Sequence, residues 1–306
     1  MSASGLVIVD KPGGMTSHDV VARVRRLAGT RKVGHAGTLD PMATGVLVVG
    51  VQQATRLLGY LTLTEKEYAA TIRLGQSTST DDAEGETTGT SSAAGVSAET
   101  LAAAMAGLTA DIKQVPPAVS AVKVDGQRAY RLTRAGAAPE LKARPVTVSE
   151  LAVTALHRDG DYLDVDATVR CSSGTYIRAL ARDLGAALGT GGHLTRLRRT
   201  RVGSYRVEEA RTLDQLAERF AVLPLAQAAS AAFPRRDLTA DEARRLANGG
   251  RLAPAGVSAE TPAVAPGRSG PGPAGPGPTA AYAPDGSLVA LVTEESGQAR
   301  PLVVFA

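Results

Sequence analysis

One segment of the chain reads Gly34-His-Ala-Gly-Thr-Leu-Asp-Pro-Met-Ala-Thr-Gly45 and continues into the apolar run Val46-Leu-Val-Val-Gly-Val51. Three glycines and one proline among twelve residues restrict the first part to an unusual backbone path. The apolar run predicts a strand that is buried on both faces. Taken singly, an Asp before a Pro is typical of a turn and a loop His is typical of a surface. Together on a shaped loop that enters a buried strand, Asp40 and His35 form a candidate active site.

The flanking segments predict a mixture of strands and helices. Gly5 to Asp10 has the length and apolar character of a buried strand, and a Lys-Pro-Gly-Gly turn follows it. Thr16 and Asp19 have the spacing of a capping box, which predicts that a helix begins there. Apolar residues alternate with polar ones in Glu67 to Leu74 and again in Tyr162 to Cys171, as in half-buried strands.

Further segments complete the predicted order of elements. We expect a helix over Ala102 to Leu108 and a second helix capped by Ser172 or Ser173. The acidic and polar stretch Thr78 to Thr90 predicts an exposed loop. Because strands and helices follow one another without regular alternation, the fold class is α+β rather than a doubly wound parallel sheet.

Length and composition predict two domains. The chain has 306 residues, and a domain typically holds about 150. A tract rich in Ala, Pro and Gly occupies residues 253–281, which we expect to be disordered. Short strands are expected after this tract, at 279–283, 287–293 and 301–305, and a capped helix before it, at 239–248. We therefore predict a catalytic domain over 1–230 and a small C-terminal domain over 234–306 that the tract interrupts.

Several classes of function are excluded by what the sequence lacks. It has no Walker loop, dinucleotide-binding glycine motif, nucleophile elbow or HExxH motif. The single cysteine, Cys171, allows neither an internal disulfide nor a Cys-rich zinc site, and it fits a reducing compartment. No apolar run approaches the length of about 20 residues that spans a membrane. We expect a cytoplasmic protein that uses no cofactor and no metal.

Basic residues gather in two clusters of a chain whose formal net charge is +4. The first cluster comprises Arg23, Arg25, Arg26, Arg31 and Lys32, and the second comprises Arg196, Arg198, Arg199 and Arg201. A single cluster is usually a solvated helix face. Two clusters in a basic chain favour a phosphate-binding surface, as in proteins that bind nucleic acid.

Five motifs, in order along the chain, resemble the TruB family, the bacterial enzymes that make pseudouridine 55 in the TΨC loop of tRNA. The first motif has two parts, Asp10-Lys-Pro-Gly-Gly-Met-Thr-Ser-His18 and Lys32-Val-Gly-His-Ala-Gly-Thr-Leu-Asp-Pro-Met-Ala-Thr-Gly-Val-Leu47. The others are Lys66-Glu-Tyr-Ala-Ala-Thr-Ile-Arg-Leu-Gly75, Pro116-Pro-Ala-Val-Ser-Ala-Val-Lys-Val-Asp-Gly126, Gly174-Thr-Tyr-Ile-Arg-Ala-Leu180 and Leu194-Thr-Arg-Leu-Arg-Arg-Thr-Arg-Val-Gly203. The resemblance covers nearly all of residues 5–205.

The resemblance implies a role for each matched residue. Asp40 would be the catalytic carboxylate, Arg178 the arginine that pairs with it, and Tyr68 the tyrosine that stacks on the target base. His35 would fill the space that the flipped uridine leaves. The remaining substrate-binding positions implied by the family are Tyr176, Leu197, Lys11 and Gly37. Whether Asp40 attacks the base, attacks the sugar or assists elimination stays open.

The family also implies a fold and a partner. The fold is a mixed, mostly antiparallel sheet with flanking helices, an RNA-gripping insertion at about 115–145 and a small β-rich PUA-like C-terminal domain. The insertion carries Lys123, Arg128, Arg131 and Arg134. The partner would be the T-arm of tRNA, bound by a monomer mainly through shape and phosphate contacts.

Two other functions remain open on the residues alone. A non-catalytic RNA-binding or RNA-folding protein would keep the basic surface and His35 but would need neither Asp40 nor Arg178. A cofactor-free hydrolase or lyase would use Asp40 with a histidine and would bind no RNA. An enzyme of the resembling family could also act as an RNA chaperone.

Overall fold

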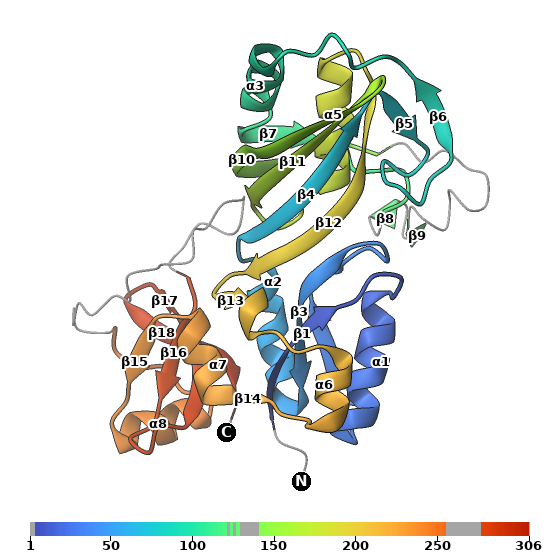
Figure 1. Ribbon diagram of the computed structural model, residues 1–306. Coiled ribbons are helices and arrows are strands. Elements are labelled where there is room, and N and C mark those ends of the chain that lie inside the picture. The colour runs from blue at the N-terminus through green and yellow to red at the C-terminus, as the bar shows by residue number, and fades with distance from the viewer. Residues whose placement is uncertain (1–3, 121–122, 125–126, 129–140, 255–276, 306) are drawn as a thin grey trace. The chain divides into compact units, whose positions relative to one another are not determined.

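The computed structural model describes residues 4–120, 123–124, 127–128, 141–254 and 277–305. The chain forms two compact units (Figure 1). Unit 1 comprises Met1–Pro41, Gly45–Thr64 and Arg201–Ala306, and unit 2 comprises Met42–Thr44 and Glu65–Thr200. The predicted division of the sequence into two domains near residue 230 is a different division from these two units and stays a prediction.

Unit 1 is built on strands β1 (Gly5–Lys11) and β3 (Thr44–Val51), which pair antiparallel. The other elements of its first half are α1 (Ser17–Ala28), β2 (Val33–Ala36), η1 (Gln52–Leu57) and α2 (Leu58–Thr62). After residue 200 the unit adds β13 (Tyr205–Arg206), η2 (Val207–Glu209), α6 (Leu213–Glu218), β14 (Leu223–Pro224) and α7 (Leu225–Ala232).

Both faces of β3 are buried, as its unbroken apolar run predicts. Leu47 and Val49 pack in a core with residues of α1 and α6. Val46 and Val48 on the opposite face pack in a second core with residues of η1, α2 and α7. This double burial fixes the register of the strand that follows the Gly34–Gly45 segment.

The C-terminal part of unit 1 is a four-stranded sheet. Its strands are β15 (Arg235–Asp237), β16 (Thr279–Tyr282), β17 (Leu288–Glu295) and β18 (Gln298–Val304), in that order, and α8 (Ala240–Ala247) packs against them. The three predicted strands and the capped helix are thus confirmed. The predicted disordered tract lies mostly outside the described residues, but it was wrong for 279–281, which belong to β16.

Unit 2 is an antiparallel sheet in the order β12-β4-β11-β10-β7. Its strands are β4 (Lys66–Leu74), β7 (Ala110–Gln114), β10 (Arg144–Asp159), β11 (Tyr162–Cys171) and β12 (Gly192–Val202). Helix α5 (Ile177–Ala187) packs against one face of the sheet, and α3 (Ala98–Gly107) packs near α5 (Figure 1). Small two-stranded sheets are formed by β5 (Gln76–Thr78) with β6 (Thr87–Thr90) and by β8 (Lys123–Val124) with β9 (Gln127–Arg128).

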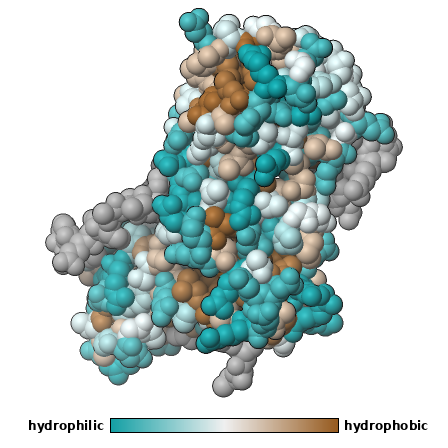
Figure 2. Space-filling view, viewed as in Figure 1, coloured by the Kyte–Doolittle hydropathy of each residue, from teal (hydrophilic) through white to brown (hydrophobic). Residues whose placement is uncertain are grey.

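The predicted α+β class with mostly antiparallel strands is confirmed, since only β15 and β16 among the described pairs run parallel. The predicted RNA-gripping insertion lies largely outside the described residues. No helix in the described part of the chain has the length and apolar character to span a bilayer. On the face seen in Figure 2, apolar residues form small separate patches among hydrophilic ones. The exposed apolar side chains include Val153 and Leu156 of β10.

Two local predictions were wrong. The segment Thr78 to Thr90 is not a simple exposed loop, because Thr78 and Asp82 are buried in it. Neither Ser172 nor Ser173 caps α5. The N-cap is Tyr176, and Ser172 instead accepts a hydrogen bond from the Thr147 amide at 2.9 Å.

Candidate active site

The loop that carries Asp40 is held on its N-terminal side by a buried hydroxyl. The Leu39 amide donates to Ser17 Oγ at 2.9 Å, and that hydroxyl donates back to the Leu39 carbonyl at 3.1 Å. Ser17 is buried in the first turn of α1. The capping box of Thr16 and Asp19, confirmed here, fixes where this helix begins. The residue before Asp40 therefore has a defined position relative to α1.

A buried lysine holds the loop on the other side of Asp40. Lys11 Nζ donates to the carbonyls of Pro12 at 2.8 Å, Met15 at 2.7 Å and Pro41 at 3.1 Å. Its side chain is 0% exposed, so these charge-assisted bonds form away from solvent. The Pro41 carbonyl also accepts from the Gly14 amide at 2.9 Å. Lys11 thus ties the turn after β1 to the Asp40 loop.

The remaining predicted residues of unit 1 are Gly37, on the loop before Asp40, and His35, on strand β2. Gly37 has φ +82°, a left-handed conformation that explains the need for glycine. His35 lies on β2 opposite Val49 of β3 and makes an edge contact with the His18 ring, with centroids 5.5 Å apart.

Unit 2 contains the other four predicted residues. Tyr68 lies on β4 on the same face as Ile72, and it is 7% exposed. Helix α5 contacts the strand that carries Tyr68. Leu197 of β12 is also buried and lines a cavity with Ala70 and Ala83.

Tyr176 and Arg178 begin helix α5. The Tyr176 amide donates to Gln114 Oε1 at 2.8 Å, and Gln114 Nε2 donates to the Tyr176 carbonyl at 3.0 Å. The buried Gln114 side chain therefore supplies the cap that the sequence reasoning assigned to a serine. This contact joins the end of β7 to the start of α5.

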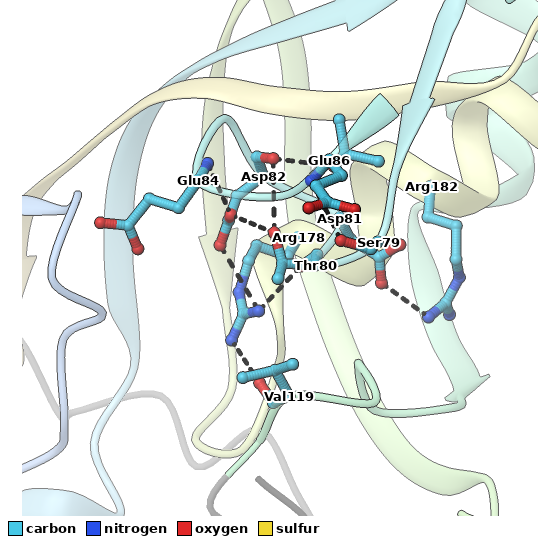
Figure 3. A network of polar contacts seen from close by, with 10 residues as sticks. Ser79, Thr80, Asp81, Asp82, Glu84, Glu86, Val119, Arg178 and Arg182 are labelled. Carbon is cyan, nitrogen blue, oxygen red and sulfur yellow. Dashed lines mark hydrogen bonds and ion pairs between the residues drawn. The ribbon is translucent and has the colours of Figure 1, made fainter. Parts of the chain in front are cut away.

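Arg178 is buried in a network of polar contacts (Figure 3). Its guanidinium donates to the Thr80 carbonyl at 2.8 Å and to the Val119 carbonyl at 3.0 Å, and it lies 3.5 Å from Asp82 Oδ2. Asp82 Oδ1 in turn accepts from Thr80 Oγ1 at 2.5 Å and from the Glu84 amide at 3.0 Å. These contacts fix the plane of the guanidinium in a desolvated site.

Asp82 is the functional candidate that sequence reasoning missed. It lies in an acidic, polar stretch whose composition suggested exposure. The signal that was available is the adjacent pair Asp81-Asp82 soon after the Tyr68 motif, since a carboxylate is the natural partner of a buried arginine. The pairing itself joins residues far apart in sequence.

The structure agrees with the predicted exposure of the first basic cluster and corrects that of the second. Arg23, Arg25, Arg26, Arg31 and Lys32 are all exposed, as a phosphate-binding surface requires. In the second cluster Arg196 is exposed, but Arg199 is 1% exposed and cannot contact phosphate in this conformation. Arg199 lies close enough to the buried Lys66 to oppose its charge, and burial with this repulsion lowers the pKa of Lys66 to about 8. Within the described residues no cluster of three His, Cys, Asp or Glu side chains is placed to hold a metal ion.

Family models match the chain in three consecutive stretches. Residues 25–177 match the TruB family pseudouridylate synthase N-terminal domain, and residues 178–228 match the tRNA pseudouridylate synthase B C-terminal domain. Residues 258–306 match the tRNA pseudouridine synthase II C-terminal domain.

Curated relatives and solved structures agree with these matches. The tRNA pseudouridine synthase B of Thermobifida fusca (strain YX) is 62% identical over 99% of both chains, and that of Arthrobacter sp. (strain FB24) is 60% identical over 99% of this chain and 97% of its own. A chain of an H/ACA RNP bound to a substrate RNA containing 2'-deoxyuridine superposes with a TM-score of 0.70 at 25% identity, covering 99% of this chain and 85% of that one. A chain of a Cbf5-Nop10-Gar1 complex gives the same TM-score at 26% identity, covering 99% of this chain and 84% of that one.

Proposed function

This chain belongs to the TruB family of pseudouridine synthases, and we propose that it isomerises uridine 55 in the TΨC loop of tRNA with Asp40 as the catalytic carboxylate. Membership makes the chain an RNA pseudouridine synthase, an isomerase, and the names of its relatives make tRNA its substrate. The position in tRNA and the identity of the catalytic residue are the parts that we propose.

One observation carries the assignment of Asp40. Both of its neighbours in the chain are held by buried side chains, Leu39 by Ser17 and Pro41 by Lys11. Burying a polar side chain destabilises the fold unless the side chain is hydrogen-bonded. A turn aspartate with no function would not require two buried polar side chains to hold its neighbours. Fixed placement of a reacting group is what catalysis by orientation requires.

The reaction needs a carboxylate and a dry, shaped pocket. It breaks the bond from uracil N1 to ribose C1′, turns the base and joins C5 to C1′. The proton lost from C5 is balanced by one gained at N1, so no electrons are exchanged with a cofactor. We propose that the flipped base stacks on Tyr68 between Tyr176 and Leu197, while His35 fills the space it leaves.

Arg178 is proposed to face the Asp40 carboxylate when RNA is bound. A desolvated guanidinium with a fixed plane favours the ionised form of an opposed carboxylate. Glycine at position 37 gives the loop its turn, and Lys11 acts indirectly, by stabilising the loop conformation that presents Asp40 to the bound uridine.

RNA binding is assigned to the exposed basic surface of α1 and the segment after it, Arg23 to Lys32. We propose that these side chains contact phosphates of the T-arm, together with the insertion at 115–145 and the C-terminal domain at 234–306. In this proposal the enzyme acts in the cytoplasm as a monomer and needs neither metal nor cofactor.

The test is incubation of the protein with unmodified tRNA, followed by chemical mapping of pseudouridine. We expect a single product site at position 55, lost in Asp40→Asn while the dissociation constant for tRNA changes less than about threefold. Asp214→Asn, which alters an exposed carboxylate on α6 of the same unit, should retain full activity.

Three outcomes would contradict the proposal in distinguishable ways. Product from Asp40→Asn at the wild-type rate would remove Asp40 from the mechanism. Tight tRNA binding without product would favour the RNA-folding alternative. Absence of both binding and product would leave the hydrolase or lyase alternative.

A further inference from the structure

Helix α5 presents a second arginine one turn after Arg178. Arg182 Nη1 donates to Asp81 Oδ2 at 3.1 Å (Figure 3), and Arg182 Nη2 donates to the Val115 carbonyl at 2.9 Å. Its Nε also bonds the neighbouring Asp183 at 2.9 Å. Unlike Arg178, Arg182 has a side chain that is 32% exposed. None of the motifs that assign the reaction includes this residue.

The two arginines bind the same two segments of the chain. Arg178 contacts the carbonyl of Thr80 and the carboxylate of Asp82, and Arg182 contacts Asp81, the residue between them. In the other segment Arg178 bonds the carbonyl of Val119 and Arg182 bonds that of Val115. Each segment is therefore held at two points by two rigid guanidinium groups on one helix.

The turn at Asp81 needs such support. Its φ is +60°, in the left-handed region that few residues other than glycine, Asn and Asp adopt. Its side chain is 15% exposed, and its carbonyl accepts from the Leu194 amide at 3.1 Å. Loss of the Arg182 contact would let this residue relax, and its two neighbours are the acceptors that orient Arg178.

We propose that Arg182, through its ion pair with Asp81 and its bond to the Val115 carbonyl, is a positioning residue that holds the Arg178 guanidinium in its working orientation. This inference rests on the proposed role of Arg178 in catalysis. Because Val115 begins the predicted RNA-gripping insertion, the same contact links the start of that insertion to Arg178. Arg182 itself touches no reacting atom.

The kinetic test measures the single-turnover rate constant at saturating enzyme and the dissociation constant for unmodified tRNA. Arg182→Ala should lower the rate constant about 10- to 100-fold, because small misplacements of a catalytic group have effects of this size. The tRNA affinity should change less than about threefold. Arg182→Lys should recover part of the rate, since an ammonium group can keep the ion pair with Asp81 but not all the hydrogen bonds that the guanidinium makes.

Two further variants separate positioning from general loss of stability. Asp81→Asn removes the charge while keeping a residue type that tolerates positive φ, and it should lower the rate constant in the same direction. The Arg182→Ala/Asp81→Asn double variant should be no slower than the slower single variant, because both changes break the same ion pair between Arg182 and Asp81. Arg73→Ala is the matched control. It removes an arginine of similar side-chain exposure, 29%, that is ion-paired to Asp164 on the neighbouring strand of the unit 2 sheet. Its rate constant should stay within about twofold of wild type.

A second measurement follows Arg178 directly. In protein labelled at arginine Nε and Cζ, the Arg178 signal, assigned by its loss in Arg178→Lys, should shift or broaden in Arg182→Ala and not in Arg73→Ala. An unchanged signal would overturn the inference whether or not the enzyme proves active. A rate constant within twofold of wild type, or a loss confined to tRNA affinity, would also overturn it. Product from Asp40→Asn would instead count against the proposed function alone.

Discussion

Replacing Asp82 should destabilise unit 2 strongly, although its sequence context suggests an exposed loop. The carboxylate is 4% exposed and accepts hydrogen bonds from Thr80 Oγ1 and the Glu84 amide. Its second oxygen lies 3.5 Å from Arg178 Nη1, whose side chain is 5% exposed. Asp82→Ala therefore leaves two donors without this acceptor and a buried cation without this carboxylate.

The magnitude follows from the geometry. At 3.5 Å and an effective dielectric constant of about 20, the attraction between the two charges is about 5 kcal/mol before desolvation is counted. Removing one partner of a buried pair typically costs about 3–5 kcal/mol, which we expect for Asp82→Ala. Asp82→Asn keeps an oxygen acceptor for Thr80 and Glu84 and loses only the charge, so we expect about 2–3 kcal/mol.

Urea unfolding of the three proteins measures these differences. The slope of unfolding free energy against urea should be unchanged, which shows that the folded and unfolded states expose similar surface. Asp111→Ala is the control, since this exposed carboxylate also accepts a 2.5 Å hydrogen bond, from Thr147, and its loss should cost less than about 0.5 kcal/mol. If Asp82→Ala unfolds within 1 kcal/mol of Asp111→Ala, the reasoning from burial and pairing is wrong.

Three further predictions concern other buried groups. Burial lowers the pKa of Lys66 from 10.5 to about 8, so the unfolded chain holds this proton more tightly than the folded protein does. The free energy of unfolding should therefore rise between pH 8 and 10.5, by up to about 3 kcal/mol. Urea unfolding at pH 7.5 and 10 should show this rise in the wild type, and Lys66→Met should abolish the contribution of the lysine. Gly185→Ala should destabilise by more than about 3 kcal/mol in thermal unfolding, because a Cβ would lie 2.2 Å from the Gly191 carbonyl carbon. Lys11→Met should lower the single-turnover rate about 10- to 100-fold by releasing the Pro41 carbonyl, with tRNA affinity retained.

Each of these predictions has a result that would contradict it. A parallel pH dependence in wild type and Lys66→Met would show that the lysine does not titrate in this range. Gly59→Ala on α2, where a Cβ meets open space, should be harmless, and equal effects at positions 59 and 185 would refute the packing argument. A Lys11→Met enzyme with full activity would show that the Asp40 loop keeps its conformation without the lysine.

Local patterns were sufficient for much of the fold. The alternation in β4 and β11 correctly assigned the buried face that carries Tyr68, because that face is apolar in both strands except at Lys66. The capping residues of α1 and α8 also lie within four positions of the groups they bind. Such features depend on neighbours in sequence, so periodicity and capping rules recover them.

The missed features depend on residues distant in sequence. The cap of α5 comes from Gln114, 62 positions before Tyr176, and Asp82 is buried because Arg178 meets it across 96 positions. A polar residue on its own gives no sign that a distant charge will compensate its burial. Arg199 shows the reverse case, since an arginine in a basic cluster is expected at the surface and lies instead in the interior.

Buried cations in both units bind backbone carbonyls, and such bonds suit a loop that carries the carboxylate proposed to react. Lys11 holds Pro41 through its carbonyl, and Arg178 holds Thr80 and Val119 in the same way. A carbonyl keeps its charge distribution whatever happens at the neighbouring side chain. If Asp40 loses its charge on forming a bond to substrate, an ion pair with that carboxylate would weaken, whereas the bond from Lys11 to Pro41 would not. In the proposed reaction the loop can therefore keep its geometry even if the charge of Asp40 changes.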